Sequence, residues 1–171
     1  MKTPTATTSS GPVQGRADSA GILSFLGIPS DVDVLVGTNS DEANLFYVPA
    51  GAVRARDAML ALTAEFYRQP ALQLAADPSG SYVYEFAWRS PAFDGALGAC
   101  HALELPFVFN TLDDPGYAGL LGSCPPQHVA DSIHRAWVAF ATTGEPGWPP
   151  YQPDSRLTMR FDNRRAVTAG P

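Results

Sequence analysis

The alternation of apolar and polar positions along the chain predicts an α/β domain. Residues 31–36 (DVDVLV) form a short β-branched run closed by Gly37, which is typical of a buried strand end. Residues 53–76 show no alternation and are rich in Ala, Leu, Arg and Glu. We expect a helix there in two pieces, the second beginning at Pro70, where a missing N–H is tolerated. Residues 81–88 (SYVYEFAW) form the strongest strand candidate. The order strand, helix, strand favours a parallel pair with a right-handed crossover.

The C-terminal third combines a helical pattern with an extended tail. In residues 127–143, apolar side chains recur at helical spacing and Gly144 follows where a glycine commonly ends a helix. We assign Trp137 and Phe140 of this helix to the core. Residues 148–162 are interrupted by prolines, so we expect an extended segment with an edge strand.

Length, composition and charge narrow the class of protein. The chain has 171 residues, of which 45% are apolar and 16% charged, as expected for a single packed domain. Its net charge is −6, and its Lys and Arg residues are scattered, which argues against nucleic acids and anionic membrane surfaces as partners. The polar N-terminal residues show no apolar run typical of a signal peptide, and the chain has no run long enough for a membrane span. We therefore expect a cytoplasmic protein with a small-molecule substrate.

The cysteine and histidine spacing predicts no metal site, and we expect no cofactor. Cys100 and Cys124 form no CxxC motif and have no metal-ligand spacing to His128 or His134. Two free thiols are the simpler interpretation of the cysteines, and a disulfide between them stays open. We expect both of these histidines to be structural or solvated.

Chemically capable side chains follow each of the two predicted parallel strands. Asp41 and Glu42 come after the first strand, and His101 comes after the second strand and a Gly-rich loop. Reactive groups gather beyond the carboxyl ends of parallel strands, and an acid beside a histidine can orient the imidazole. The alternative is that both acids stabilise the start of a helical turn, where carboxylates are favoured without any catalysis. Glu104 is expected to be a local hydrogen-bond or salt-bridge partner.

Two further side chains near these positions can be assigned roles. Cys100 is adjacent to His101, but neighbours in an extended loop tend to point to opposite sides, so we do not expect it to act as a nucleophile. Ser40 lies close to Glu42 in the sequence, and its hydroxyl is a candidate for orienting the acid or the histidine.

Two longer motifs bear a resemblance to a known family. Residues 33–46 (DVLVGTNSDEANLF) and 98–109 (GACHALELPFVF) are similar to the C-terminal part of the type-B carboxylesterases, which include para-nitrobenzyl esterases and cholinesterases. Further similar segments are residues 82–88, 136–151 and 156–162. The resemblance implies that Glu42 is the acid and His101 the histidine of a serine esterase triad. It also implies an incomplete α/β-hydrolase fold with an N-terminal hairpin, a small parallel β-α-β core and C-terminal helices.

The N-terminal residues resemble a different part of the same family. Residues 10–29 (SGPVQGRADSAGILSFLGIP) are similar to the first hairpin of these esterases, and the pattern of residues 11–29 itself predicts a β-hairpin. The chain then passes directly to the acid loop, which we interpret as an internal deletion with its junction near Ser30. The spacing between Phe46 and Phe66 also indicates a shortened lid region. We thus treat residues 1–171 as a single truncated domain made of an N-terminal hairpin segment (1–30) and a C-terminal part (31–171).

The nucleophile of such an esterase has no counterpart in this sequence. None of its serines stands in a G-x-S-x-G elbow, and the Gly-Gly oxyanion loop of the family is also missing. Because a triad works as a unit, we expect a carboxylic-ester hydrolase by resemblance that is weakly active or inactive alone. Exposed apolar faces left by the deletion should make the chain marginally stable or self-associating. Two alternatives stay open: a non-catalytic interaction or oligomerising fragment, and one half of a two-chain esterase.

Overall fold

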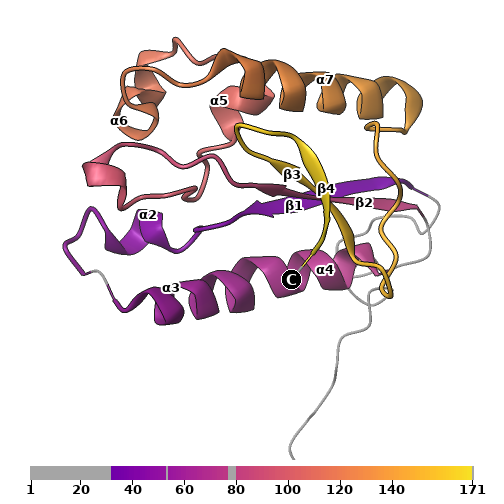
Figure 1. The fold of residues 1–171 in the computed structure, drawn as a ribbon, viewed down its shortest axis with the longest axis horizontal. Helices are drawn as coiled ribbons and strands as arrows, with labels where there is room; N and C mark the ends of the chain where they lie inside the picture. The colour runs from indigo at the N-terminus through magenta and orange to yellow at the C-terminus, as the bar shows by residue number, and fades with distance from the viewer. Residues whose placement is uncertain (1–31, 53, 77–79, 171) are drawn as a thin grey trace, which may run out of the picture.

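A four-stranded mixed sheet lies between two layers of helices (Figure 1). The computed structural model describes residues 32–52, 54–76 and 80–170. The sheet order is β1-β2-β3-β4; β1 pairs with β2 and β2 with β3 in parallel, and β3 pairs with β4 in antiparallel. The strands are β1 (Val34–Asn39), β2 (Ser81–Phe86), β3 (Leu157–Phe161) and β4 (Ala166–Ala169). This confirms the predicted α/β class, whereas the expected hairpin over residues 11–29 and the segment 1–30 lie outside the described residues.

Strand β1 extends further than its sequence pattern indicates. Gly37 does not close the strand: it lies within it, opposite Tyr84 of β2. A Cβ atom at Gly37 would collide with the ring and the carbonyl oxygen of Tyr84, so the glycine allows that ring to lie across the strand. Because the ladder continues to Asn39, the strand ends only three residues before Glu42.

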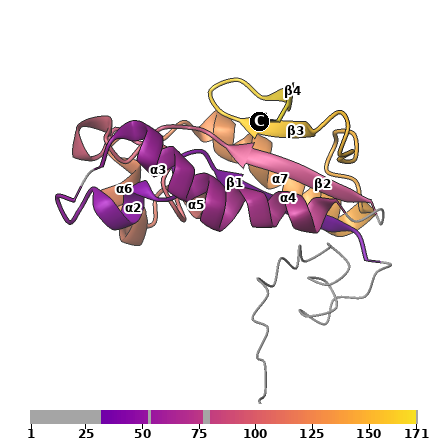
Figure 2. The same ribbon diagram turned by 90° about the horizontal axis from the view of Figure 1, so that it is seen from below.

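A continuous helical segment, which we call the helical rod, lies between β1 and β2 in the chain and covers one face of the sheet (Figure 2). It consists of α3 (Arg56–Thr63), a π-helical turn (Ala64–Arg68) and α4 (Gln69–Ala75). The predicted helix in two pieces is present as α3 and α4, and α4 begins one residue before the predicted start at Pro70; the junction residues keep right-handed helical backbone angles, so the pieces are continuous. Pro70 cannot donate a helical hydrogen bond, and the wider turn before it takes up that defect without a break.

The opposite face of the sheet is covered by α7 and by short helices. The predicted helix over residues 127–143 is confirmed as α7 (Gln127–Thr143), and Gly144 follows it in the left-handed conformation with φ 77°. Trp137 and Phe140 are half-buried and pack against the core from its margin, whereas Val129 and Ile133 are fully buried. On this side lie α5 (Leu105–Val108) and α6 (Ala118–Leu121), whereas α2 (Asn44–Tyr47) follows the end of β1 and lines a hollow together with α3. Two 3₁₀ turns span Phe93–Gly95 and Pro115–Tyr117.

The main apolar core lies between the sheet and the α5–α7 layer. Phe107 of α5 is fully buried, with its ring centroid 5.1 Å from that of Phe86 and 5.0 Å from that of Trp88. Burying one such side chain contributes about 1.5–3 kcal/mol, so this aromatic cluster anchors the segment that follows His101. Helix α5 has only four residues, and it is therefore the packing of its hydrophobic side chains that holds it in place.

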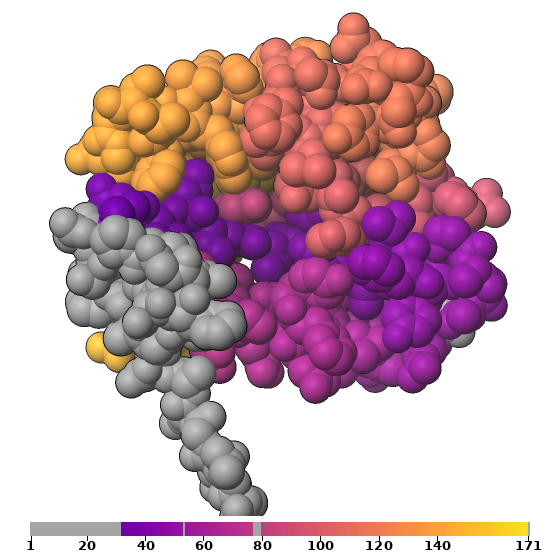
Figure 3. All heavy atoms as spheres, turned by 180° about the vertical axis from the view of Figure 1, so that it is seen from behind, coloured from indigo at the N-terminus to yellow at the C-terminus, as the bar shows by residue number. Residues whose placement is uncertain are grey.

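Strand β3 is an interior strand, contrary to the prediction of an edge strand. It lies between β2 and β4, because the chain reverses after Phe161 and adds β4 as the outer strand. At the opposite edge of the sheet, β1 has no strand partner other than β2 within the described part of the chain. Figure 3 shows β1 from behind, visible between the two helical layers. In the same described residues, no helix is long and apolar enough to cross a bilayer.

Candidate active site

Glu42 lies in the turn that follows β1, and the last residue of β1 binds its carboxylate. The backbone N–H of Asn39 donates to Oε1 of Glu42 over 2.7 Å. The Glu42 residue is 5% exposed, and burial raises the pKa of its carboxyl from the ordinary value, while hydrogen bonds from Asn39 and His101 act in the opposite direction. The acid is thus a buried group with a fixed orientation.

His101 lies in a loop that is joined to the acid turn by backbone contacts. The N–H of Asp41 donates to the carbonyl of Ala99 over 2.9 Å, and the N–H of Ala99 donates back to Oδ2 of Asp41 over 3.0 Å. Gly98 has a φ of +60°, and a Cβ atom there would collide with the Asp41 carboxylate. The Gly-rich loop noted in the sequence is therefore required so that the two loops can come into contact.

The two predicted site residues meet directly. Nδ1 of His101 lies 2.8 Å from Oε2 of Glu42. The carboxylate side chain is 7% exposed and the imidazole side chain 44% exposed. No hydrogen bond to Nε2 of His101 comes from any residue within 32–52, 54–76 or 80–170. With Nδ1–H donated to the carboxylate, Nε2 is the nitrogen available to accept a proton from a reactant.

Asn39 joins the acid turn to the histidine loop through its side chain as well as its backbone. Its Nδ2 donates to the carbonyl of Cys100 over 2.7 Å and also to the carboxylate of Glu104. Asn39 is 1% exposed, so these bonds are made away from solvent. Glu104 is a hydrogen-bond partner as predicted, but the partner is Asn39, which is distant in the sequence and not local. Sequence reasoning missed Asn39, although its place three residues before Glu42 at a strand end was a usable signal.

An open hollow of about 410 Å³ adjoins the acid and the histidine. Its walls come from β1 and from the helical rod, including Phe66 and Tyr67. The ring centroids of Tyr67 and Phe46 lie 5.4 Å and 5.5 Å from that of His101. These aromatic groups were also missed by sequence reasoning, because only the tertiary structure places the rod beside the histidine loop.

The alternative in which both acids stabilise the start of a helical turn is not what the structure shows. The residue before α2 is Ala43, and no side chain caps this helix. Asp41 instead pairs with Arg89, with Nη1 of the guanidinium 2.6 Å from Oδ2. The two adjacent acids therefore have separate partners, Arg89 for Asp41 and His101 for Glu42.

Ser40 does not orient either member of the pair. Its hydroxyl donates to the carbonyl of Phe86 over 3.4 Å, and its backbone N–H donates to the same oxygen over 2.9 Å. The proposed orienting role of Ser40 was wrong, because the side chain is used to join the end of β1 to the end of β2.

The remaining candidate side chains are two cysteines and two histidines, and none of them belongs to the acid–histidine pair. Cys100 is fully buried, and burial raises the pKa of its thiol to about 12, so it is not a nucleophile at neutral pH. Cys124 is exposed, and both cysteines are free. His134 bonds the carbonyl of Val108 over 2.8 Å. His128 is exposed and bonds the carbonyl of Asn163 over 3.2 Å. No cluster of three metal-ligating side chains occurs among the described residues.

Known proteins resemble this chain in both sequence and structure. No protein-family model matches the chain. The para-nitrobenzyl esterase of Bacillus subtilis (strain 168) is 27% identical over 184 residues, which cover 85% of this chain and 37% of the esterase. A solved structure of a PNB esterase superposes with a TM-score of 0.70 at 25% identity, covering 90% of this chain and 39% of that one. The chain is related over part of its length to the type-B carboxylesterases.

A second type-B relative supports the same family relationship over a shorter span. The phenmedipham hydrolase of Pseudarthrobacter oxydans is 39% identical over 95 residues, covering 50% of this chain and 19% of that hydrolase. The chain therefore spans well under half the length of these carboxylesterases. Its sheet and helices correspond to a part of the α/β-hydrolase fold of the PNB esterases.

Proposed function

We propose that this chain carries the acid and histidine of a carboxylic-ester hydrolase, with Glu42 orienting His101 as the general base. The observation that supports this most directly is the 2.8 Å contact between Oε2 of Glu42 and Nδ1 of His101. The relationship to type-B carboxylesterases supports it independently.

In this proposal, the role of each group follows from its surroundings. The carboxylate of Glu42 accepts the proton on Nδ1, which keeps Nε2 unprotonated and directed to the solvent side of the pair. When Nε2 takes a proton from a hydroxyl nucleophile, the carboxylate stabilises the imidazolium that forms. Asn39 keeps the acid in place during this step, because its N–H occupies the other oxygen of Glu42.

The hydroxyl nucleophile must come from elsewhere, since the 171-residue sequence contains no G-x-S-x-G elbow. We therefore expect the chain alone to hydrolyse esters weakly or not at all. A serine supplied by another chain would complete the catalytic group. A small ester is the expected substrate in either case.

The hydrogen-bonded pair can be tested without turnover. A proton shared between imidazole and carboxylate gives a far-downfield NMR signal, which we expect from Nδ1–H of His101. The signal should vanish in Glu42→Gln and in His101→Ala and persist in Glu65→Gln, which removes an exposed carboxylate from the helical rod. If the parent chain gives no such signal, or if Glu42→Gln retains it, the assigned roles are wrong.

Turnover is tested separately with short-chain p-nitrophenyl esters. We expect release of p-nitrophenol close to the uncatalysed rate from the purified chain. Turnover that is lost in His101→Ala but kept in His128→Ala would contradict the expected inactivity and would show that this chain finds a nucleophile of its own.

A second candidate function is that of an interaction fragment, which the exposed aromatic groups favour. Phe46 and Phe66 are 55% and 63% exposed beside the hollow, and the outer side of β1 has no strand partner among the described residues. Such surfaces are common where a second protein surface binds. Size-exclusion chromatography with light scattering tests this: a defined oligomer supports an interaction role, and a heterogeneous aggregate or a monomer contradicts it.

A further inference from the structure

A second hollow, of about 250 Å³, is lined by Asp41 of the acid turn, whereas the hollow beside His101 is lined by Glu42 of the same turn. It is lined by residues of α2 and α3, by Arg54 just before α3, and by Arg89 and Ala96 after β2. His101 and Glu42 do not line it, so it is separate from the candidate active site.

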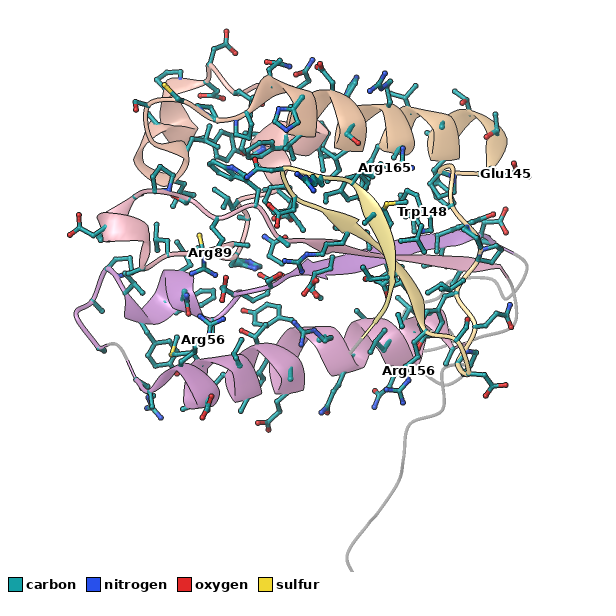
Figure 4. The ribbon with its side chains drawn as sticks, viewed as in Figure 1. Arg56, Arg89, Glu145, Trp148, Arg156 and Arg165 are labelled. Atoms are coloured by element: carbon teal, nitrogen blue, oxygen red, sulfur yellow. The ribbon has the colours of Figure 1, made fainter. Side chains whose placement is uncertain are left out.

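Three arginines line this hollow: Arg54, Arg56 and Arg89. Figure 4 shows the side chains of Arg56 and Arg89 near each other in the view, at the end of the molecule that holds α2. Arg54 lies over the ring of Tyr47, 5.3 Å from the centroid. Within the described residues, neither Arg54 nor Arg56 has a carboxylate partner.

The single carboxylate in the wall, that of Asp41, is already paired with Arg89. Asp41 is 5% exposed, and its Oδ2 already accepts hydrogen bonds from Arg89 over 2.6 Å and from the N–H of Ala99 over 3.0 Å. Arg54 and Arg56, both exposed, thus line one small space without a carboxylate partner among the described residues. An anion that binds there would gain charge-assisted hydrogen bonds, and guanidinium matches the shape of a carboxylate.

The remaining wall decides which class of anion fits. Val48, Met59 and Leu60 line the same space, and Met59 is 5% exposed. A phosphate group alone would leave these side chains without a partner, whereas a carboxylate carried on an apolar body can use both parts of the wall. A polyanion is disfavoured by the net charge of −6.

We propose that this hollow binds a small organic monocarboxylate, with Arg54 and Arg56 holding the carboxylate and Val48, Met59 and Leu60 contacting its apolar body. Binding there needs neither His101 nor a serine, so the site is independent of the proposed hydrolysis. Asp41 precedes Glu42 in the sequence, which places the bound acid beside the turn that carries the catalytic candidate.

The test uses the full 171-residue chain labelled with ¹⁵N and titrated with benzoate, acetate and inorganic phosphate. We expect benzoate to shift the side-chain Nε–H signals of Arg54 and Arg56 and to bind more tightly than acetate or phosphate. Arg56→Gln should weaken benzoate binding about tenfold, the usual effect of losing one hydrogen bond to a charged group. Arg56→Lys, which keeps the charge and loses the paired donors, should fall between the parent and Arg56→Gln.

Arg164→Gln is the matched control, because it removes an exposed arginine that does not line the hollow. It should leave the affinity for benzoate unchanged. If Arg164→Gln and Arg56→Gln weaken benzoate binding equally, the effect comes from the overall charge of the chain and the proposed site is overturned. Tighter binding of phosphate than of benzoate would overturn the ligand class, and the absence of any saturable shift would overturn the proposal as a whole.

Discussion

The backbone N–H of Asn39 donates to Oε1 of Glu42 over 2.7 Å. The side chain of the same asparagine donates to the carbonyl of Cys100, the residue before His101, over 2.7 Å. One buried residue at the end of β1 therefore sets the position of both the acid and the histidine.

Removing the Asn39 side chain should loosen the pair and destabilise the fold. Asn39→Ala leaves the Cys100 carbonyl and the Glu104 carboxylate without their donor, at a cost of about 1–3 kcal/mol. The free energy of unfolding in urea measures this cost, and the downfield Nδ1–H signal of His101 should weaken at the same time. A signal as strong as in the parent chain, together with a cost below about 0.5 kcal/mol, would show that Asn39 has no positioning role.

Glu42→Gln should stabilise the protein at neutral pH. Burial raises the pKa of Glu42 above its ordinary value of 4.5, so the native state binds this proton more tightly than the unfolded chain does. The contribution of Glu42 to stability is then greatest below pH 4.5 and falls as the pH rises through 4.5 toward the raised native value. We expect Glu42→Gln to unfold at a higher temperature than the parent at pH 7, with the difference shrinking below pH 4.5.

The measurement for Glu42→Gln is thermal unfolding followed by circular dichroism across this pH range. Glu65→Gln, which changes an exposed carboxylate, serves as the control and should unfold with the parent at every pH. A Glu42→Gln variant that is less stable than the parent at pH 7 would mean that the contact with His101 outweighs the cost of burial.

Adding one methyl group at Gly37 should be strongly destabilising. The Cβ atom of Gly37→Ala would collide with the ring and the backbone oxygen of Tyr84, and backbone cannot move aside cheaply. We expect a loss of about 3 kcal/mol, at the upper end for overpacking. In Gly119→Ala the new Cβ meets no atom within 4 Å, so this control should be neutral or slightly stabilising. Urea unfolding of both variants provides the comparison.

The two thiols should differ widely in reactivity. Cys100 is fully buried with its pKa raised to about 12, while Cys124 is exposed. A thiol reagent such as DTNB should label one cysteine rapidly in the folded chain and the second only in denaturant. The fast reaction should disappear in Cys124→Ser and remain in Cys100→Ala. Fast labelling of Cys100 would contradict its buried position.

The sequence by itself determined the α/β class and helix α7, because periodicity and aromatic or β-branched content report local structure directly. The order strand, helix, strand determined the parallel β1–β2 pair. Its pattern offered Asp41, Glu42 and His101 as candidates beyond two parallel strands, and the resemblance to the type-B carboxylesterases selected Glu42 and His101. The tertiary structure decided the rest. The strand register brings Asn39 to the end of β1, and β4 covers β3 as the outer strand. The contacts of Asp41 with Arg89, of Asn39 with Cys100 and of Tyr67 with His101 join residues far apart in the chain. Such contacts depend on packing between elements, which no local pattern encodes.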